Sequence, residues 1–193
     1  MEKTPTRKEL SHDRIVDAAA RAIRRRGYAG VGVADVMKDA GLTHGGFYAH
    51  FESRDALLVA AIERAGRGSA SHIAKSTAAL RDEGASPFRA LVESYLSDRL
   101  LKSPDAGCPV AMLCSEMPRQ AGAVRKASTA RVDSLLKYVG RSLSPAVPAD
   151  QAGVIAATLV GSLQIARAIG SVEQGKRLLA TARKTLLAQY DLS

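Results

Sequence analysis

The sequence contains no tryptophan, and aromatic residues make up only 4% of its 193 residues. Strands of β-sandwiches and β-barrels are enriched in aromatic and β-branched side chains, so this composition favours a helical protein. No apolar run approaches the roughly 18–20 residues of a membrane span. The first ten residues, MEKTPTRKEL, have no signal-peptide core, and the chain has two cysteines. We therefore expect a cytoplasmic protein with reduced thiols and no membrane contact.

The motifs of common enzymes are also missing. The sequence has no glycine-rich phosphate loop, no spaced set of metal ligands and no evident pair of nucleophile and base. We expect no catalytic residues, no metal site and no cofactor. A protein of this kind binds a partner, which is either nucleic acid or, more remotely, another protein through a helical interaction module that does not bind DNA.

The net charge of +9 is compatible with a nucleic-acid partner but does not locate it. Residues 1–52 hold nine Lys or Arg against seven Asp or Glu, a net of only +2, and the other residues carry the remaining +7. Charge alone therefore does not identify the N-terminal part as the DNA-binding end.

Helical periodicity and capping residues predict an all-α chain with about nine helices. The expected N-caps are Ser11, Thr43, Ser53, Ser86 and Ser171, and Pro87 suits the first position of a helix. We expect a loop at 102–107. The expected helices cover residues 11–26, 33–40, 43–51, 53–81, 86–101, 108–117, 118–143, 150–169 and 171–190.

The segment GLTHGGFYAHF, residues 41–51, has two adjacent glycines where a helix is expected. Each glycine costs a helix about 1 kcal/mol relative to alanine. Helices 33–40 and 43–51, joined by the AGL turn, form a helix-turn-helix, whose second helix enters the major groove. At its start, Gly45 and Gly46 allow the backbone to approach phosphate. Tyr48 and His44 can donate hydrogen bonds to DNA, Arg54 can pair with phosphate, and His50 suits a structural role.

From RIVDAAARAIRRRGYAG to SRDAL, roughly residues 12–62, the chain resembles the DNA-binding domain of the TetR family of bacterial transcriptional regulators. The resemblance implies a dimer on a palindromic operator, usually a repressor that a small molecule releases. It divides the chain into a DNA-binding domain, 1–52, and a helical regulatory and dimerisation domain, 53–193. The positions that it matches to phosphate contacts are Tyr48 and Arg54, and those that it matches to the DNA-facing surface are Thr43, His44, Gly45 and Gly46. Family residues that often touch DNA are replaced at Val31, Gly32, His44 and Ala49, so the operator sequence cannot be read.

The last two expected helices are rich in apolar residues, and VIAATLVGSLQIA is apolar on nearly all sides. Such a helix needs cover on more than one face. The apolar stripe of the final helix consists of Leu178, Leu179, Ala182, Leu186 and Tyr190. The resemblance implies a homodimer through these two helices and a pocket for an unknown inducer among the middle helices. The candidate pocket residues are Tyr95, Arg99, Met112, Met117 and Tyr138.

Cys108 directly precedes Pro109 and is expected to occupy the N-cap of a short helix. A thiolate in that place is stabilised by the free N–H groups, which would make Cys108 a reactive sensor of electrophiles or oxidants. The GC pair also resembles that of TetR-type repressors that sense electrophiles through a cysteine. We expect the loop before Cys108 to leave this thiol near the surface, and Cys114 to lie in the core. The alternative is that Cys108 is a small buried residue without a sensing role.

Overall fold

The computed structural model describes residues 5–103 and 107–192. In that part of the chain, turns and loops connect helices, and there is no strand. The expected loop at 102–107 falls partly on residues 104–106, which lie outside the described residues. The elements are α1 (Arg7–Arg26), α2 (Val33–Asp39), η1 (His44–Ala49), α3 (Arg54–Asp82), α4 (Pro87–Tyr95), α5 (Asp98–Lys102), α6 (Pro109–Leu113), η3 (Met117–Arg119), α7 (Gly122–Ser142), α8 (Gln151–Ala168) and α9 (Val172–Tyr190).

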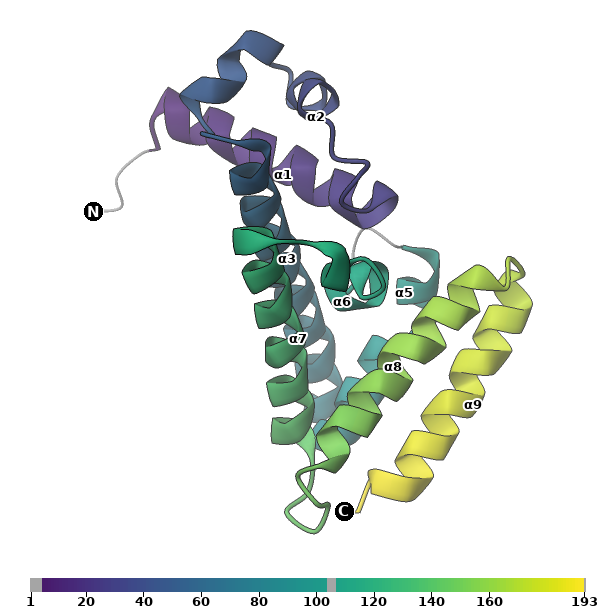
Figure 1. Cartoon of the computed structure of the whole chain (residues 1–193). Helices are drawn as coiled ribbons and strands as arrows, with labels where there is room; N and C mark the ends of the chain where they lie inside the picture. Colours follow the sequence, from purple (N-terminus) through teal and green to yellow (C-terminus); the bar gives the residue numbers. More distant parts are fainter. Residues whose placement is uncertain (1–4, 104–106, 193) are drawn as a thin grey trace.

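The molecule is elongated, with α1, α2 and η1 gathered at one end (Figure 1). The long helix α3 leads from that end into the rest of the protein, where α7 runs beside it. Helices α8 and α9 pack against each other on the other side of the molecule. This arrangement makes α3 the direct covalent connection between the helix-turn-helix end and the other helices.

Three of the expected N-caps are confirmed by hydrogen bonds, whereas Ser11 lies inside α1 and Thr43 precedes η1 without a capping bond. The hydroxyl of Ser53 accepts from the backbone N–H of Ala56 at the start of α3 (3.1 Å). Ser86 caps α4 in the same way, with Pro87 at the first helical position, and Ser171 caps α9. Each cap satisfies a backbone donor that the helix itself leaves unpaired, which explains why these helices begin where they do.

Several expected helices differ from the structure. The expected helix 108–117 ends as α6 at Leu113, and the expected helix 118–143 begins as α7 only at Gly122, after η3. The segment 43–51 contains a 3-10 helix, η1, rather than an α-helix, which agrees with the low α-helical propensity of its two glycines. The expected helix 86–101 is divided into α4 and α5, because Ser97 ends one hydrogen-bonded run and caps the next. The first helix starts at Arg7, earlier than expected, because Thr6 and Glu9 form a reciprocal capping box.

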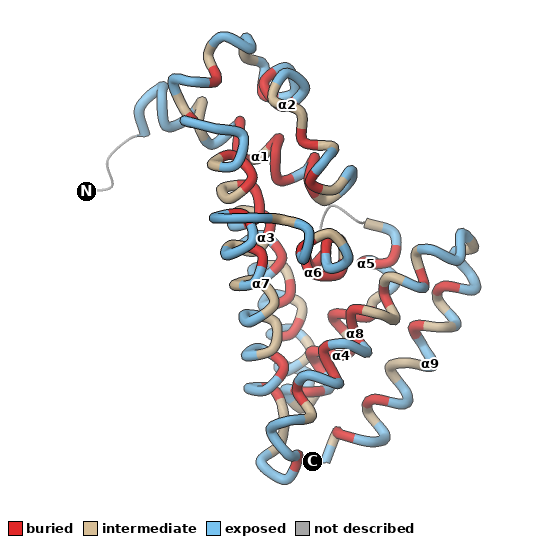
Figure 2. Tube along the Cα trace, in the orientation of Figure 1, coloured by how far each residue is buried: buried red, intermediate tan, exposed pale blue. Residues whose placement is uncertain are grey.

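The buried residues form one continuous hydrophobic cluster that includes both ends of the molecule. Figure 2 shows them in red along α1 and α3 and where α4 and α8 meet, whereas many outer turns of α7 and α9 are pale blue. Arg64 of α3 reinforces the contact with α1, since its guanidinium binds Asp17 at 3.0 Å and Asp13 at 2.5 Å. The first turns of α3 therefore pack as part of the helix-turn-helix end.

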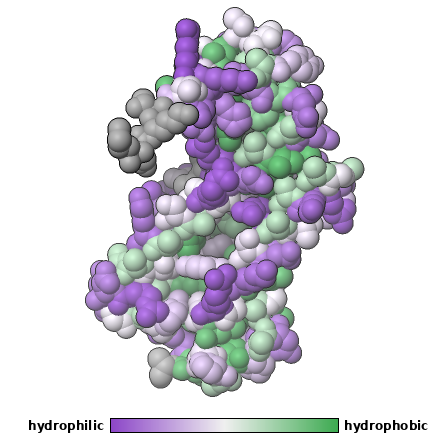
Figure 3. Space-filling view, turned by 90° about the vertical axis from the view of Figure 1, so that its left-hand side faces the viewer, coloured by the Kyte–Doolittle hydropathy of each residue, from purple (hydrophilic) through white to green (hydrophobic). Residues whose placement is uncertain are grey.

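Two further features concern the surface. Among the described helices, none combines the length and apolarity that crossing a membrane would require. On the face that lies on the left in Figure 1, hydrophilic and hydrophobic residues are mixed, and no single large apolar patch covers it (Figure 3).

Candidate DNA-binding segment and ligand cavity

The 3-10 helix η1 presents polar side chains outward on an aromatic base. Phe47 and Phe51 are buried, and their rings stack with centroids 5.7 Å apart. Tyr48 points the other way and is 74% exposed, although Phe47 contacts the edge of its ring. Thr43, His44 and Gly45 are exposed as well. The segment is thus anchored from below while the predicted DNA-contacting residues remain accessible.

The two glycines of η1 are not required by packing within the protein. A methyl group added to Gly45 would meet nothing within 4 Å, and one added to Gly46 would make ordinary contact with Met37 at 3.6 Å. Neither residue has a positive φ angle. The glycines therefore leave a smooth, open backbone on the exposed side of η1, where an outside surface can approach closely.

Arg54 has a role inside the protein. Its Nε donates to the carbonyl oxygen of Val31 at 2.9 Å, and one terminal nitrogen, Nη2, donates to that of Tyr28 at 2.5 Å. Both carbonyls belong to the loop between α1 and α2. Arg54 thus holds that loop against the start of α3, a function that sequence reasoning did not foresee. Its predicted phosphate contact stays a prediction.

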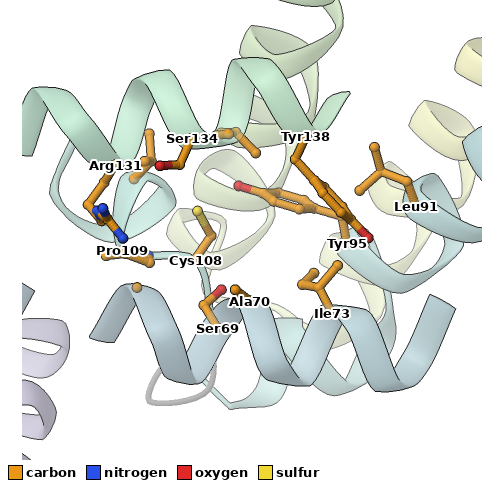
Figure 4. Close-up of a pocket in the computed structure, with 13 residues that line it drawn as sticks. Ser69, Ala70, Ile73, Leu91, Tyr95, Cys108, Pro109, Arg131, Ser134 and Tyr138 are labelled. Atoms are coloured by element: carbon orange, nitrogen blue, oxygen red, sulfur yellow. The ribbon is translucent and has the colours of Figure 1, made fainter. Parts of the chain in front are cut away.

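A cavity of about 130 Å³ lies between α3, α4, α6 and α7. Its walls are mainly apolar, and they include Ile73 and Leu91. Figure 4 shows Ser69, Ala70 and Ile73 on one side and Arg131, Ser134 and Tyr138 on the other. Two of the predicted ligand-binding residues, Tyr95 and Tyr138, line this cavity. Ser134 and Tyr138 are also exposed, so the cavity adjoins the surface at α7.

Two polar groups in the cavity wall lack partners in the protein. The hydroxyl of Tyr95 is buried and has no hydrogen bond within normal geometry, and the same holds for Nε of Arg131. Burial, reinforced by the neighbouring Cys108 thiol, raises the pKa of Tyr95 well above 10, so this phenol stays protonated. Three other buried polar atoms, in His50, Ser94 and Arg167, also lack partners, but only Tyr95 and Arg131 share this cavity wall, where a bound molecule can supply the partners that buried polar groups normally have.

The other predicted ligand-binding residues do not line this cavity. Arg99 lies at a separate polar hollow on the surface, together with His72 and Lys75. Met112 is half-buried and its sulfur contacts Arg167, whereas Met117 is buried in η3. A ligand role for these residues stays a prediction. Arg131, which sequence reasoning missed, belongs to the cavity instead.

The two cysteines occupy the opposite environments from those expected. Cys108 does precede α6 as its N-cap residue, but its side chain forms no capping bond and the residue is only 8% exposed. The expectation of a thiol near the surface is therefore wrong, because Cys108 turns into the cavity beside Tyr95. Cys114 is exposed rather than part of the core, because it lies at the C-terminal end of the short helix α6.

Tyr28, in the loop between α1 and α2, joins the helix-turn-helix end to the cavity region. Its N–H donates to the Glu116 carboxylate at 3.1 Å, and its hydroxyl lies 2.6 Å from that of Ser128 on α7. Gly27 makes the first contact possible, since a side chain there would collide with Glu116 at 2.3 Å. Burial raises the pKa of Tyr28. Tyr28 is thus bonded both to α7, which carries Arg131 of the cavity wall, and to the segment that follows α6.

Helix α8 keeps an apolar face that its own protomer does not cover. Val154 and Ile165 are 56% and 58% exposed, and their separation of three helical turns puts them on one side of the helix. In α9, by contrast, Leu179, Leu186 and Tyr190 are buried within the protomer. Of the two helices α8 and α9, it is therefore mainly α8 that has an exposed apolar face.

Within the described residues, no group of three or more His, Cys, Asp or Glu side chains is arranged to hold a metal ion.

Comparison with known proteins gives a consistent result. The family model of bacterial regulatory proteins, tetR family, matches residues 15–61. An uncharacterised helix-turn-helix transcriptional regulator of Mycobacterium tuberculosis is 28% identical over 166 residues, covering 80% of this chain and 83% of that protein. A second M. tuberculosis regulator is 41% identical, but the alignment spans only 30% of this chain and 29% of that relative.

Solved structures share the complete fold. A TetR transcriptional regulator from Chloroflexus aurantiacus superposes with a TM-score of 0.77 at 23% identity, covering 94% of this chain and 96% of that one. A TetR-family regulator from Agrobacterium tumefaciens gives a TM-score of 0.76 at 20% identity, covering 95% and 98%. The helix-turn-helix with its exposed η1 and the family match lead to one conclusion: the chain carries the DNA-binding domain of the tetR family of bacterial regulatory proteins, and it shares the all-helical fold of solved TetR-family regulators.

Proposed function

We propose that this protein is a sequence-specific, DNA-binding transcriptional regulator that works as a cytoplasmic homodimer and has no catalytic activity. It binds a palindromic operator as a repressor, and a small molecule releases it. The observation that carries this proposal is the exposed surface of η1. Thr43, His44, Gly45 and Tyr48 are accessible there above a buried aromatic base, and Gly45 has open space beside it.

The dimer is supported by the exposed face of α8. A soluble monomer rarely leaves large aliphatic side chains aligned along one helix, and a two-fold contact would cover Val154 and Ile165 with their own counterparts. Two DNA-binding ends in one dimer match the two halves of a palindrome. This pairing through α8, with α9 beside it, agrees with the family expectation.

Release by a ligand is supported by the bonds at Tyr28. Helix α7 carries Arg131 in the cavity wall and, one turn earlier, Ser128, which is bonded to Tyr28. The segment after α6 carries Glu116, also bonded to Tyr28. A ligand that displaces α7 or α6 would therefore change the position of the loop between α1 and α2. In a dimer, this changes the separation of the two η1 segments and lowers the affinity for the operator.

Alkylation or oxidation of Cys108, in the same cavity, is a second route to release of the protein from DNA. Its burial means that a reagent has to enter the cavity before it reaches the thiol. A bulky adduct would then push against α3 and α7, as a bound ligand would. Treating the wild type and Cys108→Ser with a small electrophile and comparing release of the operator decides between the two routes.

The direct test is a gel-shift assay with DNA from beside the protein's own gene. We expect a shift that competitor DNA of unrelated sequence does not abolish. Tyr48→Ala removes an exposed donor without touching the core, so it should weaken binding at least tenfold while the thermal unfolding midpoint stays the same. Lys137→Ala, a change at an exposed residue of α7 outside the cavity wall, should leave the affinity in the absence of ligand unchanged. Equal binding by Tyr48→Ala and the wild type would contradict the proposal.

A further inference from the structure

The polar groups in the wall of the cavity indicate which class of molecule it can bind. Tyr95 is 1% exposed, and Figure 4 shows its hydroxyl directed along the cavity toward Cys108. This hydroxyl and Nε of Arg131 are the two buried donors in the wall without a partner. In the described residues, no carboxylate forms an ion pair with Arg131. The protein therefore places a guanidinium whose Nε has no partner, and a phenol hydroxyl whose one polar neighbour in the wall is the Cys108 thiol, beside a mainly apolar space.

Arg131 is held in place by an unusual contact with α3. A methyl group added to Gly66 would lie 2.7 Å from Cδ and from Nη1 of Arg131, so only glycine admits the arginine so close to α3. The side chain consequently crosses between α7 and α3 instead of extending into water, as an arginine on a surface helix normally does. Gly66 thus places the guanidinium in the cavity wall.

The volume of the cavity limits the size of the ligand. An engineered apolar cavity of about 150 Å³ in another protein holds one benzene molecule. The present cavity, about 130 Å³, therefore accommodates one ring or a short chain beside the polar groups. Ile73, Leu91 and Leu135 offer aliphatic surface for that part of the ligand.

The charge of the cavity wall limits the charge of the ligand. A guanidinium group binds a planar carboxylate through two parallel hydrogen bonds, and a phenol hydroxyl donates to an acceptor oxygen. Arg131 is the single Lys or Arg that lines the cavity. Arg167, which lies near Tyr95 and Cys108, already donates to the carbonyl oxygen of Leu100 and to the sulfur of Met112, so the guanidinium available to a ligand is that of Arg131. A dianion such as a phosphate ester would leave an unbalanced charge in apolar surroundings, which is costly.

We infer that the cavity binds a small monocarboxylate with a compact apolar body, whose carboxylate is held by Arg131 and Tyr95. This inference rests on the proposed function, since it names the chemical class of the molecule that releases the protein from DNA. The cavity also explains the position of Cys108: its small side chain forms the part of the wall between the two polar groups.

The test is direct binding by isothermal titration calorimetry, without DNA, using benzoate and hexanoate as probes and benzamide as the uncharged match of benzoate. We expect at least one of the two carboxylates to bind, and benzoate to bind at least tenfold more tightly than benzamide.

Arg131→Gln should weaken carboxylate binding at least tenfold, and Tyr95→Phe should weaken it severalfold. Arg141→Gln, an exposed arginine on the same helix, is the matched control and should leave binding unchanged.

A second measurement uses the cysteines as reporters. A bound carboxylate should slow the reaction of Cys108 with iodoacetamide, whereas the exposed Cys114 should react at the same rate with and without it. Absence of binding by both carboxylates would overturn the inference. So would equal affinity for benzoate and benzamide, or wild-type affinity in folded Arg131→Gln. Because no DNA is present, binding here together with failure to bind any operator would overturn the proposed function and leave this inference standing.

Discussion

The hydroxyl of Tyr28 lies 2.6 Å from that of Ser128, and both groups are buried. Ser128 also lies 2.7 Å from the carbonyl oxygen of Val124 and, with its single proton, donates to it. Tyr28 must then donate to Ser128, so the bond has one direction. It joins the loop before α2 to α7 across 100 positions of sequence, and in the proposed function it carries a change at the cavity to the helix-turn-helix end.

Removing this bond should separate the ligand response from DNA binding. We expect Tyr28→Phe to lose about 1 kcal/mol of unfolding free energy, the usual value of one hydrogen bond, and to need more ligand for release of the operator. Ser128→Ala should behave alike, whereas Thr129→Ala removes an exposed hydroxyl and should change neither quantity. Urea unfolding and a release titration measure the two effects. Wild-type release by both folded variants of the pair would show that the bond does not transmit the signal.

Gly45 should affect DNA binding without affecting stability. Because a methyl group has open space there, Gly45→Ala should fold as well as the wild type, but the added group would hold the backbone away from DNA. We expect at least a tenfold loss of operator affinity. Gly68→Ala is the matched control: it lies in α3 with open space, should gain about 1 kcal/mol of stability, and should bind DNA normally. If Gly45→Ala kept full affinity, close approach at this position would be ruled out.

Arg54 connects stability with DNA binding. Since its guanidinium bonds two loop carbonyls, Arg54→Ala should lower the free energy of unfolding by about 1–2 kcal/mol, whereas Tyr48→Ala should not lower it. The salt dependence of operator affinity tests the predicted phosphate contact separately. Each lost phosphate contact reduces the slope of log affinity against log salt by about 0.9, hence by about twice that in a dimer. Unchanged stability of Arg54→Ala would contradict the structural role of this residue.

Tyr95 should make the protein sensitive to alkaline pH. Its pKa in the folded state is raised, mainly by burial, whereas in the unfolded chain the phenol ionises near pH 10. The stabilising effect of the protonated phenol is therefore fully present below about pH 10 and is lost as the pH rises toward the raised folded value. We expect the unfolding free energy of the wild type to fall more steeply above about pH 10 than that of Tyr95→Phe. Parallel curves in urea unfolding experiments would contradict this.

Local rules predicted the parts of the fold that local bonds determine. Ser53, Ser86 and Ser171 cap helices as expected, because an N-cap depends on a residue and its next three neighbours. The division between α4 and α5 was missed because Ser97 lies among residues whose apolar spacing also suits one continuous helix. The 3-10 form of η1 was missed because low α-helical propensity alone does not select the conformation that replaces an α-helix.

The site depends on contacts that sequence spacing does not contain. Arg131 has the appearance of an ordinary charged residue on an exposed helix, and only its passage beside Gly66, 65 positions earlier in the chain, places it in the cavity wall. Tyr28 was noted only as part of a family pattern, although its bonds reach Glu116 and Ser128. The exposed segment at η1 was easier to identify, since an unusual glycine pair close to aromatic residues is visible in the sequence itself, and its contact with DNA stays a prediction.

The central claim, a dimer that reads two half-sites through η1, is tested most directly by hydroxyl-radical footprinting on the operator DNA. We predict two protected regions whose centres lie about 34–36 Å apart along the duplex, one helical turn, and loss of both together in Ile165→Glu, which charges the exposed face of α8. Leu192→Glu, an equally exposed site outside that helix, should retain both. A single protected half-site, or two sites that persist in a monomeric Ile165→Glu variant, would contradict the claim.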